Sequence, residues 1–272
     1  MRCKMKRGYR VLVIQIFCIL CPLILLISNS ITKDIFSIWL NESFNKNSID
    51  IINNRIENFQ VWIVPIVAII GTTLIYIYIR KQNKEKYFNF GNEYMDYPYF
   101  IFYLSGKILG FEKIQLKLIP IHTQFKIITN DTFKIIEYQE ENIVSNESIV
   151  EFISNKSRSL TLVLIDTFPI SIGQLNDNLK KTDILMITKG DMKANVRSFN
   201  THFISTISEE LYQREGKYTK INICATTNTA HTYRIVSDNF KKGKRGDIKS
   251  LFVYQQNREH PRVFEKSHEI KL

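Results

Sequence analysis

Two long apolar runs near the amino terminus dominate the hydrophobic pattern of the chain. Residues 11–27 (VLVIQIFCILCPLILLI) and 61–79 (VWIVPIVAIIGTTLIYIYI) contain no charged side chain, and no third run approaches their length. A helix needs roughly 17 to 25 mostly apolar residues to cross a bilayer. The pattern therefore predicts two amino-terminal transmembrane helices within a region that covers residues 1–86.

The flanking charges predict how these two helices are oriented. Basic residues flank the outer ends of the pair, at residues 2–10 and 80–86, whereas the intervening residues 32–60 are slightly acidic. The positive-inside rule then places both termini in the cytoplasm of a two-pass protein. The first run is interpreted as a retained helix rather than a signal peptide, because no small-x-small cleavage pattern follows it.

After the apolar runs, the hydrophobic period changes. Residues 87–159 include QFKIITN and TFKIIEYQ on either side of Asn130-Asp131, which predicts a membrane-proximal β-rich segment with a hairpin. From residue 160, apolar strands (LTLVLID, DILMITKG, KINICAT, IKSLFVYQQ) alternate with segments of helical spacing. This alternation predicts a Rossmann-like α/β domain over residues 160–272 with a largely parallel sheet, so the expected fold class is membrane-anchored α/β.

Polar side chains follow three of these strands, at the ends where parallel sheets collect ligands. The strand tips are DTFP (166–169), TKGD (188–191) and TTNTAH (226–231). The helices that follow turn backbone N–H groups towards the same place, which suits an anion. We predict a ligand site made of Asp166, Thr167, Phe168, Thr188, Lys189, Thr226, Thr227, Asn228, Thr229 and His231.

A purely structural interpretation of the same residues stays open. Thr226 and Thr229 are common helix caps, as Asp166 can be at a strand end, and His231 suits an ordinary helix position. The basic turn KKGKRGD (241–247) is typical of a solvated surface, although it also supplies positive charge for an anion.

Charge and motif content narrow the possible functions. The chain carries a formal charge of +11, but residues 87–272 hold 25 Lys/Arg against 21 Asp/Glu, so direct DNA binding is not expected. The phosphate-loop, dinucleotide-binding and nucleophile-elbow glycine motifs are absent, as is metal-ligand spacing of His and Cys. We therefore expect no cofactor, no metal and no enzymatic activity.

The carboxyl-terminal third resembles a known family. INICATTNTAHTYRIVSDNF, followed by GDIKSLFVYQQN, is similar to the closing strand–helix–strand of SAVED domains, and LTLVLIDTFPISIGQLNDNLKKTDILMIT is similar to the matching half. SAVED domains are relatives of the CARF domain that sense cyclic oligonucleotides in bacterial anti-phage systems of the CBASS and CRISPR types. The resemblance covers about residues 160–258, although TTNTA stands where the family usually has a proline.

The resemblance implies an anti-phage effector at the bacterial inner membrane. In this hypothesis the cytoplasmic domain binds a cyclic (oligo)nucleotide, the protein forms a homo-oligomer, and the membrane is disrupted. Two alternatives stay open: a membrane-anchored α/β enzyme acting on a nucleotide or other phosphate compound, and a scaffold whose domain binds a protein partner.

Overall fold

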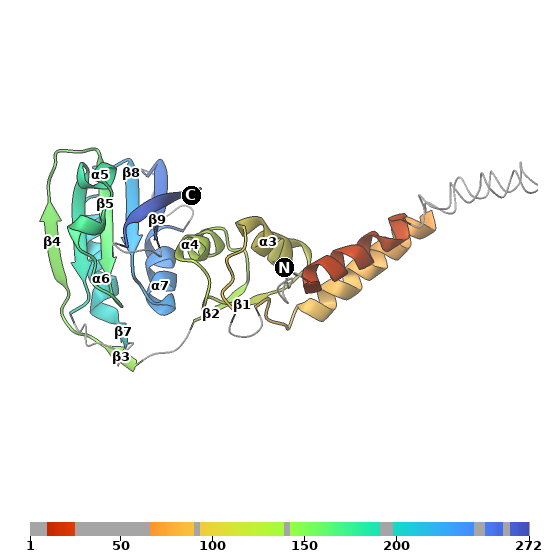
Figure 1. The fold of residues 1–272 in the computed structure, drawn as a ribbon. Coiled ribbons are helices and arrows are strands. Elements are labelled where there is room, and N and C mark those ends of the chain that lie inside the picture. Colours follow the sequence, from red (N-terminus) through yellow and green to blue (C-terminus); the bar gives the residue numbers. More distant parts are fainter. Residues whose placement is uncertain are drawn as a thin grey trace, which may run out of the picture. The chain divides into compact units, whose positions relative to one another are not determined.

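The computed structural model describes residues 10–24, 66–89, 93–138, 142–190, 198–241, 248–257 and 262–271. The chain divides into two compact units, whose parts are coloured along the sequence in Figure 1. A helical unit contains Met1–Phe90 and Lys107–Glu112, and a sheet unit contains Gly91–Gly106 and Lys113–Leu272.

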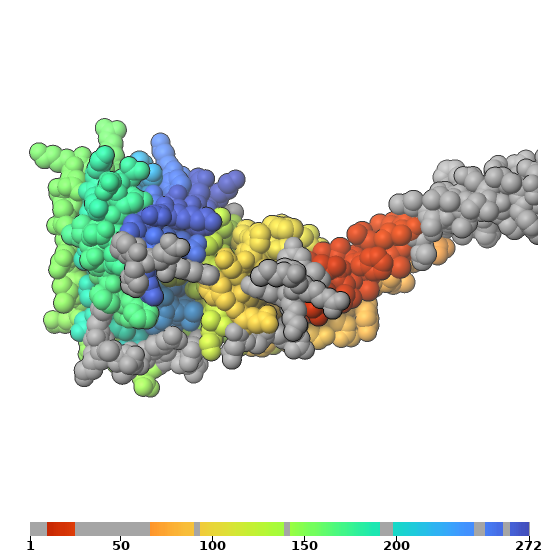
Figure 2. Space-filling model, viewed as in Figure 1, coloured from red at the N-terminus to blue at the C-terminus, as the bar shows by residue number. Residues whose placement is uncertain are grey.

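The helical unit is built on two helices, residues 10–24 and 66–83, which lie side by side (Figure 2). Asn83 is only 1% exposed, and its amide exchanges hydrogen bonds of 2.9 and 3.0 Å with the amide of Gln15. Asn83 Nδ2 also donates to the carbonyl of Leu109 at 2.9 Å. A buried amide that loses its partners is costly, so this pair fixes the register of the two helices.

The outer faces of the two helices are strongly apolar. Phe17, Val67 and Leu74 are each 60% exposed or more, and other large apolar side chains accompany them along both helices. Nevertheless, no helix in the described part of the chain is both long and apolar enough to cross a membrane. The predicted fold with two transmembrane helices is therefore wrong for the described residues. The helix over 66–83 ends in the polar sequence RKQN, while residues 25–27 and 61–65 of the apolar runs lie outside the described ranges.

The sheet unit contains one six-stranded sheet in the order β10-β9-β8-β5-β6-β4. The four central strands are parallel, but β4 is antiparallel to β6 and β10 is antiparallel to β9. The prediction of a single, largely parallel Rossmann-like sheet is therefore wrong, because the sheet is mixed. The strands are β4 (Ile149–Ile153), β5 (Ser159–Ile165), β6 (Asp183–Thr188), β8 (Lys220–Ala225), β9 (Ser250–Gln256) and β10 (Phe264–Ile270).

Helices cover both faces of this sheet (Figure 1). Leu160, Leu162 and Leu164 of β5 face one side, where they join a core with α4 (Ile121–Thr129), α6 (Thr201–Tyr212) and α7 (Thr229–Asn239). Val163 and Ile165 face the other side and pack near a short 3-10 turn (Ile172–Gln174) and α5 (Asp177–Lys180). Burial on both faces explains why the central strands are continuous apolar runs.

The remaining elements are short. Two parallel two-stranded sheets pair β1 with β2 and β3 with β7. These strands are β1 (Lys113–Gln115), β2 (Ile135–Glu137), β3 (Asn142–Val144) and β7 (Ser198–Asn200). The helix α3 (Tyr99–Tyr103) and a π-helix (Leu104–Ile108) precede β1.

The hairpin predicted around Asn130-Asp131 does not form. QFKIITN lies in α4, where Phe125 and Ile128 are buried one turn apart, and only the second stretch contains a strand, β2. Pro120 immediately precedes α4 and supplies its amino-terminal cap position. The spacing of buried residues by three and four, and not alternation, is the period that the fold uses here.

One edge of the sheet is unusually apolar. All five residues of β4, the last strand on its side, are exposed, including Ile149 at 58% and Phe152 at 39%. The guanidinium of Arg214 lies 4.9 Å and the ammonium of Lys217 5.4 Å from the centre of the Phe152 ring. These two cations cover part of an edge strand that otherwise presents apolar side chains.

Candidate ligand-binding site

The structure brings the three predicted strand tips together. Strand β5 lies between β6 and β8, and the backbone ladder continues beyond the strands. Thr167 N donates to Thr226 O at 3.2 Å, and Thr226 N donates to Leu164 O at 3.0 Å. On the other side, Lys189 N donates to Ile165 O at 2.9 Å. The tips therefore form one continuous surface at the carboxyl edge of the sheet, where α/β proteins bind ligands.

A buried ion pair lies directly beneath these tips. Lys189 Nζ is 2.8 Å from Asp166 Oδ1, and the two side chains are 2% and 0% exposed. The second carboxylate oxygen, Oδ2, accepts hydrogen bonds from His231 Nδ1 at 2.6 Å and from Asn228 N at 2.9 Å. The network thus links a residue from each of the three tips, and both oxygens of the carboxylate have partners.

The environment keeps the Asp166 carboxylate ionised. Burial alone raises the pKa of this carboxyl group, because a charge loses its hydration in the interior. The hydrogen bonds from His231, from the Asn228 backbone and from Lys189 outweigh burial, and the pKa lies below its ordinary value. The lysine and the carboxylate are therefore a charged pair that solvent does not reach.

The imidazole of His231 is held on both of its nitrogens. Nε2 accepts a hydrogen bond from the backbone N–H of Asn200 at 2.8 Å, so the ring proton is on Nδ1 and points to Asp166. The rings of Phe199 and Phe203 lie 5.2 and 5.3 Å from its centre. Both nitrogens of this buried ring therefore have protein partners in this structure, and neither is free to contact a ligand.

The polar sequence after β8 mainly organises the start of α7. Asn228 is the residue that caps the helix, since its Oδ1 accepts the backbone N–H of His231 at 2.7 Å. Thr226 does not cap α7, because its hydroxyl donates to the Phe168 carbonyl at 2.8 Å on the neighbouring tip. The asparagine and this threonine therefore fix the tips to each other and to the helix.

The ten predicted site residues separate by exposure. Phe168 is 64% exposed and lies at the outside of the tips. The half-buried members are Thr167, Thr188, Thr226, Thr227 and Thr229, and the buried members are Asp166, Lys189, Asn228 and His231. Lys193 and Arg197 follow the TKGD tip in the sequence and could add positive charge there, but they lie outside the described residues. Contact of the ten residues with a ligand stays a prediction. In this structure only exposed Phe168 and the five half-buried threonines are accessible to a ligand.

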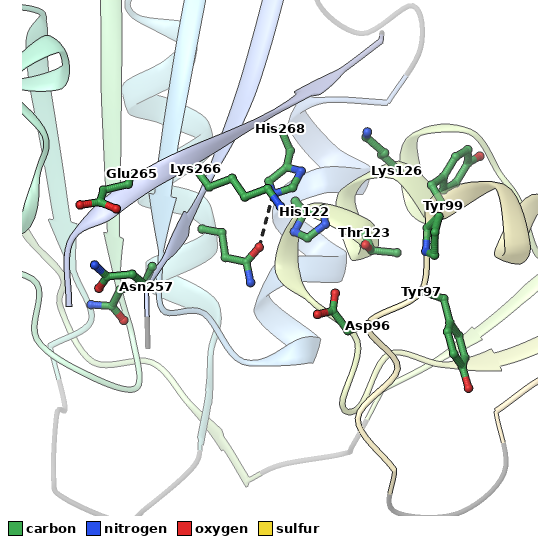
Figure 3. A pocket seen from close by; sticks show the side chains of 13 residues that line it. Asp96, Tyr97, Tyr99, His122, Thr123, Lys126, Asn257, Glu265, Lys266 and His268 are labelled. Atoms are coloured by element: carbon green, nitrogen blue, oxygen red, sulfur yellow. Dashed lines mark hydrogen bonds between the residues drawn. The ribbon is translucent and has the colours of Figure 1, made fainter. Parts of the chain in front are cut away.

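A second feature was not predicted from the sequence. A cavity of about 650 Å³ lies within the sheet unit, between α4, the segment before α3, and the joined ends of β9 and β10 (Figure 3). His122 and His268 both line it and come from elements far apart in the sequence, so no local motif indicates the cavity. Within the described residues, no group of three His, Cys, Asp or Glu side chains is arranged to hold a metal ion.

Almost the whole chain matches one protein-family model. Residues 2–271 match the model described as the SMODS- and Ubiquitin system-associated 2TM effector domain. No curated protein sequence matches the chain.

Two solved structures are also similar to the chain. Both are of the Acinetobacter baumannii Cap4 SAVED/CARF-domain containing receptor, one with the cyclic trinucleotide 2′3′3′-cAAA and one with 3′3′3′-cAAA. The identities are 11% and 9%, and the TM-scores 0.40 and 0.41. Each similarity covers 63% of this chain and 41% of the Cap4 chain, so the chain spans less than half the length of that receptor.

Proposed function

The chain belongs to the SMODS- and ubiquitin system-associated 2TM effector domain family, and we propose on this basis that it is an antiviral effector switched on by a cyclic (oligo)nucleotide. Binding of the messenger to the sheet unit makes the protein oligomerise and disrupt the bacterial inner membrane. The observation that carries the proposal is the family match, because it runs through both the helical and the sheet unit. The SAVED-like sequence pattern over residues 160–258 supports the choice of ligand.

The sheet unit offers a surface suited to part of such a ligand. The exposed ring of Phe168 gives a base a flat partner for stacking. The half-buried hydroxyls of Thr167 and Thr229 lie among the polar tips. Thr229 can donate to or accept from phosphate or sugar, whereas Thr167, whose proton goes to the Thr226 carbonyl, can only accept. Beneath them, the Asp166–Lys189 pair holds the tips at fixed positions, so the surface is organised before the ligand arrives.

The helical unit supplies the membrane-active part. Contiguous exposed apolar surface on a protein marks a lipid or protein interaction site. The outer faces of residues 10–24 and 66–83 carry many such side chains, for example Phe17 and Leu74 at 60% and 62% exposure. We propose that these faces contact lipid at the inner membrane, with the sheet unit and both termini on the cytoplasmic side.

In this proposal, oligomerisation is the step that links ligand binding by the sheet unit to membrane disruption by the helical unit. A ligand shifts a conformational equilibrium only by the difference between its affinities for the two states. A ligand bound between two copies meets this condition, because it binds the assembled form and not the single chain. Several pairs of apolar helices brought together in this way would perturb the bilayer more than one pair.

The full chain in phospholipid vesicles loaded with a fluorescent dye gives a direct test. Cyclic di- and trinucleotides added outside are expected to release the dye and to increase the size of the protein assembly, whereas AMP is not. Phe168→Ala should raise the messenger concentration required by about tenfold or more, as loss of one base-stacking contact predicts. Tyr212→Ala is the matched control, since Tyr212 on α6 is also an exposed aromatic residue, at 72% against 64% for Phe168. No dye release with any member of a broad panel would refute the proposal.

A further inference from the structure

Two stacked histidine rings lie in the cavity beside β10. The rings of His122, from α4, and His268, from β10, are stacked with their centroids 3.6 Å apart and an angle of 5° between their planes. Figure 3 shows both rings in the middle of the cavity, with His268 bonded to Gln255 through a contact of 3.3 Å. Two imidazoles in such contact cannot both be positively charged imidazolium ions without strong repulsion.

Charged side chains of both signs line the cavity around this histidine pair. Burial, the neighbouring His268, and then Lys126 and Lys266 lower the pKa of His122 to about 3. Burial and the same two lysines also lower the pKa of His268, while Asp96 acts in the opposite direction. In Figure 3 Lys266 extends from β10 towards the ring pair, whereas the Glu265 carboxylate points away from it. The rings are therefore neutral at pH 7, and the cavity lining contains two ammonium groups, Lys126 and Lys266, as well as the carboxylates of Asp96 and Glu265.

We propose that this cavity binds one nucleotide, with its phosphate at Lys126 and Lys266 and its base among the stacked imidazoles, the tyrosine rings and the amide side chains. The proposal deepens the proposed function and rests on it for the identity of the bound nucleotide as part of the messenger.

The chemistry of the lining matches each part of a nucleotide. Lysine ammonium groups form charge-assisted hydrogen bonds with phosphate oxygens. Imidazole and tyrosine rings, here including Tyr99, are surfaces on which nucleic-acid bases stack. Amides at the end of β9, such as Gln256, both donate and accept as base edges do, and the Asp96 carboxylate accepts from a ribose hydroxyl or an exocyclic amine.

Size and location are consistent with this assignment. Small-molecule sites usually measure about 300 to 1,000 Å³, and the cavity measures about 650 Å³. Because β9 is parallel to β8, its carboxyl end lies at the same edge of the sheet as the tips described above. Within the described part of the chain, the Nδ1 of His122 is buried and has no hydrogen-bond partner, so this side of the cavity contains an unsatisfied polar atom.

Binding of AMP, adenosine and inorganic phosphate to the full chain in detergent, followed by calorimetry, tests the proposal. AMP is expected to bind at least about tenfold more tightly than adenosine or phosphate, because only AMP engages both the lysines and the rings. Lys266→Gln and His122→Ala should each weaken AMP binding about tenfold or more. Lys181→Gln, an exposed lysine at the end of α5, should leave it unchanged.

The outcomes separate this inference from the proposed function. AMP binding lost in both cavity variants supports the inference, even if no cyclic nucleotide releases dye from vesicles and the effector function is refuted. AMP binding that is unchanged in both cavity variants overturns the inference, and it leaves the proposed function standing if cyclic nucleotides still release the dye. Equal affinity for AMP and inorganic phosphate shows a simple anion site, and absence of AMP binding at millimolar concentration shows no site; either result overturns the nucleotide assignment.

Discussion

Replacing Lys189 with methionine tests whether the buried ion pair holds the strand tips together. Methionine keeps most of the side-chain volume but leaves the Asp166 carboxylate buried without its cation. Removing one member of a buried pair typically costs about 3 to 5 kcal/mol. Asp166 retains its hydrogen bonds from His231 and Asn228, so we expect the lower end of that range, about 3 kcal/mol.

The double variant Asp166→Asn/Lys189→Met tells a charge effect from a packing effect. Because it buries no charge and keeps an oxygen that can accept from His231, it should recover about 1 to 2 kcal/mol relative to Lys189→Met. Urea unfolding of the full chain in a non-denaturing detergent, followed by circular dichroism, measures these differences. Lys181→Met is the matched control at an exposed lysine and should change stability by less than about 0.5 kcal/mol.

Two results would refute this reasoning. One is a Lys189→Met protein within about 0.5 kcal/mol of the wild type, which would make the ion pair energetically neutral. The other is a double variant whose loss of unfolding free energy exceeds the sum of the losses in the two single variants. This result would show that the loss comes from packing around residues 166 and 189 and not from an uncompensated charge.

Three further predictions concern other positions. Asn228→Ala should lower the free energy of unfolding by about 1 to 2 kcal/mol through loss of the α7 cap, and Asn228→Ser, which keeps a neutral capping oxygen, should restore most of it in the same urea titration; equal stability of all three proteins would contradict the capping role. Burial and His268 hold the pKa of His122 near 3, so only the unfolded chain takes up this proton below about pH 6.5. Stability should consequently fall as the pH decreases from 6.5 towards 3, and less steeply in His122→Gln; parallel pH curves would argue against it. At Gly190 an added Cβ would lie 1.5 Å from the Glu147 carbonyl oxygen, so Gly190→Ala should cost about 1 to 3 kcal/mol by forcing the β6 tip to move, and an unaltered melting temperature would disprove this.

The sequence predicted the centre of the sheet better than its edges. LTLVLID and DILMIT are mostly apolar because β5 and β6 are buried on both faces, and such runs have few alternative structures. The sequence does not single out the edge strand β4, because IVEFI is exposed along its whole length and lacks an apolar–polar alternation. β10 was missed, since FEKSHEI is mostly polar and is stabilised by pairing with β9.

The candidate site, too, was predicted from the sequence only in part. The convergence of the three tips follows from parallel strand order, which the sequence indicates. Whether Asp166, Lys189 and His231 face a ligand or each other depends on side-chain packing that no local pattern records. The stacked pair His122 and His268 is further from prediction, because it joins α4, which was mistaken for a strand, to a strand that was not expected at all.

The apolar edge at β4 has a practical consequence for handling the protein. An exposed edge strand offers unpaired backbone groups as a template for adding a further strand, and natural proteins often protect such edges with lysine. Concentrated preparations are therefore expected to aggregate through Ile149 and Phe152. Ile149→Lys, at a side chain already 58% in contact with solvent, should improve solubility without cost to the core.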